Sequence, residues 1–414
     1  MTSSGTSAPV PLGSDGGPDL YEQVDRLRAA GPAVRVGLPE GVTAWSVSRG
    51  DVVRRLLTHR GVSRDARAAV PGYRPGRVSW LFPWVDTESM FTSEGGDHTR
   101  LRRLIGPAFS PRRIEAMRPG VTAVVDGLLD ALEERPGDEP VDLRALFSYP
   151  VPTRVICDLF GVPEDQRPEV LRVFERVAAT GVSEEDAAAV RDGLMATMKA
   201  LVAFRRREPG EDMTSLLLAA REDGADRLSE QELVSTLILM LGAGSQTTIA
   251  LIGQAVRALL TDRRQLDAVR ADPGRWGDAI EETLRLHAAV MHLPLRWVTE
   301  DIDLGEGVVL RPGDAVLVAF GAHGRDPGVH RDADAFDLDR ADKEHLAFGH
   351  GVHYCLGAPL ARLEAGVALP ALFARFPGIA LAGDPRSLGF QRSFIANDVA
   401  ALPVLLNHRG TGRG

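Results

Sequence analysis

One glycine-rich stretch near the C-terminus carries the residues best suited to hold a metal ion. It spans residues 348–357, reads FGHGVHYCLG, and contains one of only two cysteines. Cys355 precedes an apolar pattern that begins at Ala358 and predicts a helix. Unpaired N–H groups and the positive end of the dipole at a helix N-terminus favour a thiolate and lower the thiol pKa. We predict that Cys355 binds iron, and that the glycines let the loop lie against a flat group.

A basic helical pattern supplies a possible anion clamp. It runs from His98 to Phe109, and His98 and Arg102 stand at positions i and i+4, so they share one helix face. Arginine binds a carboxylate with two parallel hydrogen bonds. The pair therefore predicts a carboxylate clamp, and a solvated basic face is the alternative.

A long uncharged stretch, residues 233–256, follows a capping-box signature at Ser229–Glu232. The pattern predicts a helix to about Thr261, roughly 50 Å long at ~1.5 Å per residue. Its length would suffice for a bilayer, but the polar centre SQTT at residues 245–248 favours a buried helix of a soluble protein. Each glycine of the preceding GAG costs up to ~1 kcal/mol in a helix. This cost indicates either a close ligand or a tight helix crossing.

Residues 61–96 form a long segment without a sustained period, which in compact domains is usually functional. Its aromatic side chains are Tyr73, Trp80, Phe82, Trp84 and Phe91. They indicate either a loop pinned to the core or a lid over an apolar ligand.

Composition narrows the class of protein. The chain has 414 residues, a hydrophobic fraction of 44% and a formal net charge of −9, which argues against non-specific nucleic-acid binding. Two cysteines exclude a disulfide framework and a four-cysteine metal site. Residues 1–18 lack the pattern of a signal peptide or membrane anchor and predict a disordered arm. We expect a cytoplasmic protein.

The predicted elements are many helices and few short strands, with no βαβ alternation. The predicted helices cover residues 20–30, 49–58, 98–109, 121–134, 143–159, 163–180, 184–207, 229–261, 278–287 and 358–376. The predicted strands cover residues 33–36, 43–47, 295–298, 308–310 and 315–320.

The order and spacing of these motifs resemble the cytochrome P450 family from about Asp19 onward, and most of all its soluble bacterial members from actinomycete secondary metabolism. Phe348, Gly351, Cys355 and Gly357 fill the fixed positions of the family's cysteine loop. The resemblance implies a single mainly α domain over residues 19–414, with the cytochrome P450 fold: a large helical region and a small β-rich lobe.

The resemblance also implies the cofactor and its contacts. Cys355 would be the axial thiolate of heme b, an iron protoporphyrin IX. The other implied heme contacts are His98, Arg102, Ala243, Gly244, Arg296, Phe348, Gly349, His353 and Gly357. Glu282, Arg285 and Arg340 resemble the family's structural salt-bridge triad.

The long helix resembles the family's oxygen-binding groove, with Thr247 as its alcohol. The family usually has an acid just before this threonine, and this chain has Gln246. Glutamine has no acidic proton to cycle. Proton delivery would then use water, Thr247, Ser245 or the substrate, which favours substrate-assisted or radical-coupling chemistry over simple fast hydroxylation. Gly324 stands where the family often has asparagine.

The implied activity is oxidation of a mid-sized apolar or aromatic natural product with dioxygen, by hydroxylation or oxidative coupling. Electrons would come from NAD(P)H through a ferredoxin reductase and a ferredoxin, and the protein would be a monomer. A peroxygenase using H₂O₂ and a heme-binding protein with little turnover are the alternatives. Predicted substrate contacts are Trp84, Met90, Phe91, Met240, Ala289, Val290, His292, Leu293, Phe394 and Ile395. A ferredoxin-docking set would comprise Arg100, Arg103, Arg112, Arg113 and Arg362.

Overall fold

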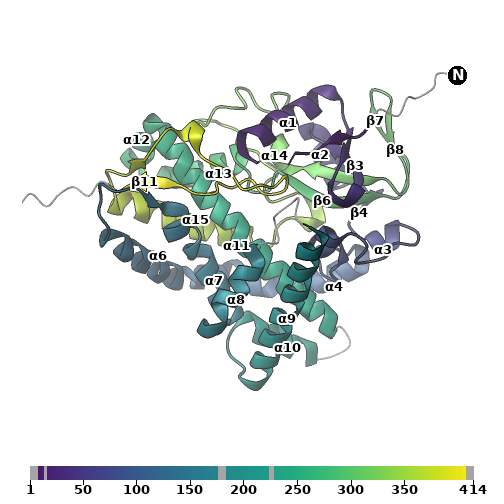
Figure 1. The fold of residues 1–414 in the computed structure, drawn as a ribbon, viewed down its shortest axis with the longest axis horizontal. Coiled ribbons are helices and arrows are strands. Elements are labelled where there is room, and N and C mark those ends of the chain that lie inside the picture. The colour runs from purple at the N-terminus through teal and green to yellow at the C-terminus, as the bar shows by residue number, and fades with distance from the viewer. Residues whose placement is uncertain (1–7, 14–15, 176–182, 223–227, 407–414) are drawn as a thin grey trace, which may run out of the picture.

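The computed structural model describes residues 8–13, 16–175, 183–222 and 228–406. Helices form the larger part of the molecule, and most strands gather in a smaller lobe with α1 (Gly17–Ala30) and α2 (Gly50–Leu57) (Figure 1). The predicted mainly α class with a small β-rich lobe is confirmed.

The main sheet has six strands in the order β1-β2-β3-β9-β6-β4. These strands are β1 (Val10–Pro11), β2 (Val34–Gly37), β3 (Thr43–Val47), β4 (Val62–Ser63), β6 (His292–Val298) and β9 (Ala315–Ala319). Smaller sheets join β10 (Ala380–Leu381), β11 (Pro403–Leu405) and β5 (Val141–Asp142), and β7 (Ile302–Gly305) with β8 (Val308–Leu310). Strand β6 pairs antiparallel with β9 and with β4, which brings residue 64 beside residues 294–296.

The helical region packs around α11 (Glu230–Thr261), which runs through its centre (Figure 1). Its capping box at Ser229 is formed as predicted. It is long and apolar enough to cross a membrane, but most of its apolar window is buried against other elements, so it is a core helix. The other helices are α3 (Ala66–Ala69), α4 (Gly95–Ile105), α5 (Pro111–Ala116), α6 (Arg118–Glu133), α7 (Pro150–Phe160), α8 (Arg167–Glu175), α9 (Glu184–Arg207), α10 (Met213–Glu222), α12 (Arg263–Ala271), α13 (Trp276–Leu286), α14 (Phe320–His323) and α15 (Ala358–Arg375).

Two predictions from the sequence need correction. Residues 1–7 and 14–15 of the expected disordered arm lie outside the described residues, but Val10–Pro11 form β1 beside β2, and α1 begins at Gly17. The segment 61–96 contains β4, α3 and two short helical turns instead of one irregular loop. The end of the helix predicted over 163–180 also lies partly outside the described residues.

Candidate active site

A cavity of about 790 Å³ lies between the cysteine-bearing loop and α11. One wall is the segment 347–357 with the start of α15, and the opposite wall is the middle of α11. Strand β6 and the segment 83–91 close a third side. The structure therefore brings together segments that lie more than 250 residues apart in the chain.

The cysteine-bearing loop is a tight turn fixed by its own backbone. The N–H of Cys355 donates to the carbonyl of Phe348 over 2.8 Å, and Gly349 and Gly351 have φ of 73° and 76°. A side chain at Gly351 would sit 2.9 Å from Thr58, so two separate constraints demand glycine there. The Cys355 side chain faces the cavity, where its surface is accessible, although it lies deep within the protein.

The pKa of the Cys355 thiol is raised, because burial opposes the charged form. The N–H groups of Gly357 and Ala358 at the start of α15 point at the sulfur, and with Arg102 and Arg362 they act in the lowering direction. The predicted helix-terminus effect is present, but the predicted net lowering of the pKa is wrong because burial outweighs it.

The cavity rim carries hydrogen-bond donors that the protein leaves unused. The Nε2 atom of His98 and the Nε atom of Arg296 are buried and have no hydrogen-bond partner within the described residues. Arg102 also lines the rim and donates to the carbonyl of Tyr354 over 2.9 Å. Burying such groups without partners is costly, so an anionic group placed at this rim would satisfy them.

One carboxylate behind the cavity lining, in contact with His353 and Arg64, was not foreseen from the sequence. Glu94 Oε1 lies 3.1 Å from His353 Nε2 and accepts the backbone N–H of Arg64 over 2.8 Å. Burial would raise the pKa of Glu94, but the bonds from His353 and Arg64 and the charge of Arg296 outweigh it and lower the pKa. The signal was its position directly before the basic helix α4.

The residues present fit a heme. A flat loop bearing one cysteine faces a helix with small residues. Buried side-chain nitrogen atoms without a partner, on His98 and Arg296, stand at one edge, where two propionate carboxylates would lie. Cys355 would ligate the iron, and His98, Arg102 and Arg296 would hold the propionates. His353 lines the same rim but is already in contact with Glu94. Phe348, Gly349, Gly357, Ala243 and Gly244 all line the cavity as predicted.

The small residues in the middle of α11 have two different surroundings: the cavity and the neighbouring helices. Ala243 is exposed toward the cavity. At Gly244 an added Cβ would lie 2.6 Å from Ile156 of α7, and at Gly242 it would lie 3.1 Å from Phe174 of α8. The glycines thus permit tight helix crossings, the alternative that the sequence left open, while Gly244 also lines the cavity.

The hydroxyl groups of α11 differ in direction. Gln246 and Thr247 line the cavity, and Thr247 Oγ1 donates to the carbonyl of Ala243 over 2.8 Å. Ser245 is buried, does not line the cavity, and donates to the carbonyl of Leu241 over 2.9 Å. The structure therefore does not place Ser245 in the cavity with Gln246 and Thr247, contrary to its predicted position in the site.

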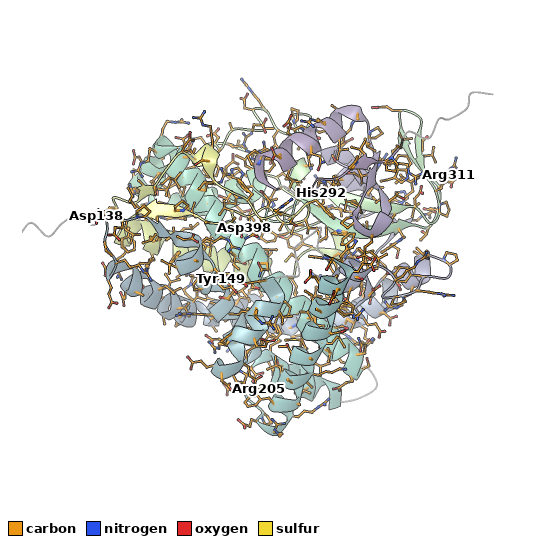
Figure 2. All side chains as sticks on the ribbon, in the orientation of Figure 1. Asp138, Tyr149, Arg205, His292, Arg311 and Asp398 are labelled. Carbon is orange, nitrogen blue, oxygen red and sulfur yellow. The ribbon has the colours of Figure 1, made fainter. Side chains whose placement is uncertain are left out.

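Most of the predicted substrate contacts line the cavity. They are Trp84, Met90, Phe91, Met240, Ala289, Val290, Leu293 and Ile395. His292 and Phe394 do not line it, and both are buried in the interior, where His292 appears in Figure 2. His292 Nδ1 lies 2.9 Å from the carbonyl of Phe394. Side chains alternate along β6, so Leu293 faces the cavity and His292 faces away.

The aromatic residues of segment 61–96 divide between the two predicted roles. Tyr73 packs edge-on against Trp297 with ring centroids 6.1 Å apart, and Trp80 packs against Phe394 at 5.7 Å. These two pin the segment to the core. Trp84 and Phe91 face the cavity. The segment is therefore both anchored and part of the site.

The predicted structural triad is formed. Glu282 and Arg285 make two hydrogen bonds of 2.8 Å with both side chains fully buried, and Arg340 Nε lies 3.2 Å from Glu282 Oε1. Arg285 also donates to the carbonyls of Ala333 and Gly324. A side chain at Gly324 would sit 2.0 Å from the Arg285 carbonyl, which explains the glycine.

Sequence reasoning missed a polar end of the cavity. Arg144 and Asp398 form an ion pair of 2.8 Å there, and Glu175 accepts a hydrogen bond from Tyr149. Asp398 and Tyr149 come from opposite halves of the chain, and both are labelled in Figure 2. Segments distant in the sequence bring these residues together, so no local sequence pattern predicts them.

Fold and site together define a heme-thiolate oxidoreductase, and comparisons with known proteins identify its family. Residues 277–386 match the family described as Cytochrome P450. The chain is 44% identical to the 2-hydroxy-5-methyl-1-naphthoate 7-hydroxylase of Streptomyces carzinostaticus, over 95% of this chain and 96% of that protein. It is 37% identical to the 6-deoxyerythronolide B hydroxylase of Saccharopolyspora erythraea, over 94% and 96%.

A solved structure supports the same family assignment. CYP154A1 from Streptomyces coelicolor A3(2) superposes with a TM-score of 0.90 at 46% identity, covering 96% of this chain and all of that one. The chain belongs to the cytochrome P450 family. It is a heme monooxygenase of the kind that oxidises natural products in bacteria, and heme and dioxygen belong to its chemistry.

Proposed function

We propose that this protein hydroxylates a compact, largely apolar aromatic natural product, with oxidative coupling as a second outcome on substrates that hold two reactive positions close together. The supporting observation is the cavity itself. Its volume of about 790 Å³ must hold both the heme and the substrate, and Trp84, Phe91 and Leu293 give it a flat apolar side.

In this proposal the protein residues bind the heme, orient the substrate and shield both from water. Cys355 holds the iron, and the donors at the rim hold the propionates. Once bound, the heme supplies dioxygen activation. Trp84 and Phe91 stack on an aromatic substrate and exclude water, and offset or edge-on ring pairs add about 0.5–1.5 kcal/mol each beyond burial.

Proton supply is the step in which this chain differs from its family's usual pattern. The Thr247 hydroxyl lines the cavity and is oriented by its bond to the Ala243 carbonyl. The Gln246 amide beside it can donate to and accept from a water molecule but does not release a proton at neutral pH. In our proposal protons arrive from water through the Thr247 hydroxyl.

In our proposal, electrons reach the site from NAD(P)H through a ferredoxin reductase and a ferredoxin in the cytoplasm. The protein acts as a monomer, with one domain over residues 19–414.

Not all arginines of the predicted ferredoxin-docking set are free to bind a partner. Arg100 pairs with Glu232, and Arg362 pairs with Glu281 at 2.6 Å. Arg112 and Arg113 are exposed on α5 and fit an acidic ferredoxin better. Reductase-driven turnover that falls with rising salt supports this docking.

A substrate panel tests the proposed chemistry. The purified holoenzyme is titrated with 2-hydroxy-5-methyl-1-naphthoate and with 6-deoxyerythronolide B, and the spin-state shift of the heme gives each dissociation constant. We expect the naphthoate to bind at least about tenfold more tightly, which equals ~1.4 kcal/mol. Tighter binding of the macrolactone would contradict the proposed substrate class.

The peroxygenase alternative is tested with the same protein. We expect reductase-driven turnover of the bound aromatic compound to exceed H₂O₂-driven turnover. The reverse order would assign the protein to the peroxygenase class, for which the missing acid at Gln246 is the supporting observation.

A further inference from the structure

A fully buried arginine lies in the wall of the cavity. Arg64 follows β4 directly, is 1% exposed, and lines the cavity beside Trp84 and Phe91. It does not belong to the rim donors, because its own donors are in use. A buried guanidinium is costly unless its hydrogen bonds are satisfied, so the partners of Arg64 indicate what its position contributes.

Three main-chain carbonyls from separate segments accept its hydrogen bonds. Arg64 Nε donates to Phe91 over 3.0 Å, Nη1 to Pro294 over 3.2 Å, and Nη2 to Trp84 over 3.4 Å. The guanidinium carbon also lies 3.6 Å from the centroid of the Phe91 ring, in cation–π contact. One side chain thus joins both cavity-facing aromatic residues of segment 61–96 to strand β6.

Two of the three acceptors, Trp84 and Phe91, lie where the chain lacks a regular hydrogen-bonding ladder. Trp84 belongs to a short turn, and Phe91 lies in a turn ahead of α4, whereas Pro294 lies within β6. Arg64 is itself fixed, because Ser63 pairs with Trp297 in the sheet and the Arg64 N–H donates to Glu94. The planar fork of arginine reaches several acceptors at fixed angles, which lysine does not do.

We propose that Arg64 is a positioning residue that sets the shape of the apolar cavity wall by fastening the main chain of Trp84 and Phe91 to β6. The side chain itself does not need to touch the substrate. It acts through the two aromatic residues, and so determines which flat ligands fit between them and the heme. This role does not depend on the identity of the natural substrate.

The test compares two arginines that bind the same segment from different sides. Arg67 donates to the carbonyl of Asp86 over 2.6 Å, but its side chain is 37% exposed and it does not line the cavity. The variants are Arg64→Met and Arg64→Lys, with Arg67→Met as the matched control. Each is prepared as holoenzyme and titrated with imidazole and with 4-phenylimidazole.

Both probes ligate iron through the same kind of ring nitrogen, so the ratio of their dissociation constants isolates the contact of the phenyl ring with the cavity wall. We expect Arg64→Met to weaken 4-phenylimidazole at least about tenfold relative to imidazole, and Arg64→Lys to fall between it and the parent. Amide hydrogen exchange over residues 82–94 rises in the same order. Arg67→Met leaves the ratio within about twofold.

Three outcomes would overturn the proposal. The first is an unchanged ratio in Arg64→Met. The second is an equal change in Arg67→Met, which would show that any anchor of the segment suffices. The third is loss of the heme-thiolate spectrum in both Arg64 variants, which would make Arg64 a residue required for folding and not for cavity shape.

Discussion

Among single residues, Gln246 distinguishes this chain most from the usual pattern of its family. It lines the cavity beside Thr247, where the family usually has an acid. Within the described residues its side-chain amide has no protein hydrogen bond, so it is available to water or substrate. Thr247 keeps its place and its bond to Ala243. The proton route therefore depends on a hydroxyl group and on water.

Gln246→Glu restores a group that exchanges protons. A positioned acid contributes about 10²- to 10⁴-fold to a proton-transfer step, and we expect reductase-driven product formation to rise at least about tenfold. Gln246→Leu is the control that removes hydrogen bonding without adding an acid, and its rate should not rise. If Gln246→Glu left every rate unchanged, the proton-relay argument would fail.

A site residue could be predicted from the sequence where its position depends on the local pattern, and not where it depends on distant segments. Cys355, His98 and Arg102 were predicted because each stands at a helix end or on one helix face. Ser245 was misplaced although it is only two residues from Thr247, and His292 although it is next to Leu293, because the sequence did not say which face of α11 or β6 meets the cavity. Arg64 and Glu94 were missed because their partners come from distant segments.

At the scale of elements, the long helices and the short α2 were predicted well, and most of the other short helices were not. The starts of α9 and α11 follow from the N-cap residues Ser183 and Ser229, whose side chains bond the first turn. The turns within residues 61–96 have no such signal. Their conformation depends on contacts with β6 and the core, such as Tyr73 with Trp297, which are absent from any local window.

Two ion pairs with the same spacing, one buried at the end of α13 and one exposed on α8, show how burial changes the contribution of an ion pair to stability. Arg285 and Glu282 are three residues apart and fully buried, whereas Arg172 and Glu169 form the same pair on α8 with about 60% and 56% of their side chains exposed. Removing one partner of a buried pair costs ~3–5 kcal/mol, and an exposed pair is worth ~0–1 kcal/mol.

We therefore expect Arg285→Ala to lower the free energy of unfolding by ~3–5 kcal/mol and Arg172→Ala by less than ~1 kcal/mol. Denaturant unfolding of both variants, followed by circular dichroism, measures the difference. Equal small effects would show that the buried triad does not hold the segment 333–340 in place.

For the whole molecule, buried histidines predict sensitivity to acid. Burial lowers the pKa of His292 to about 4, despite its bond to the Phe394 carbonyl, and burial with nearby arginines also lowers the pKa of His287 well below its usual value. The unfolded chain takes up these protons near pH 6.5, but the folded protein does not. Their contribution to stability is thus complete above about pH 6.5 and is lost as the pH falls toward 4.

We expect the free energy of unfolding to fall by up to ~1.4 kcal/mol per pH unit from His292 between pH 6.5 and 4, with a contribution of the same sign from His287. His292→Asn, which keeps a donor for the Phe394 carbonyl, removes one of these contributions and flattens the pH dependence. His59→Asn, at a half-buried position, is the control. An unchanged slope in His292→Asn would contradict the assignment.

The account as a whole depends on one bond, between Cys355 and a heme iron at the start of α15. The absorbance of the reduced, CO-bound protein tests it most directly, because a thiolate ligand shifts the Soret band far to the red of a histidine-ligated heme. We predict that this band is present in the parent protein and absent in Cys355→Ala. A parent protein without the band, or a band that survives Cys355→Ala, would contradict the account.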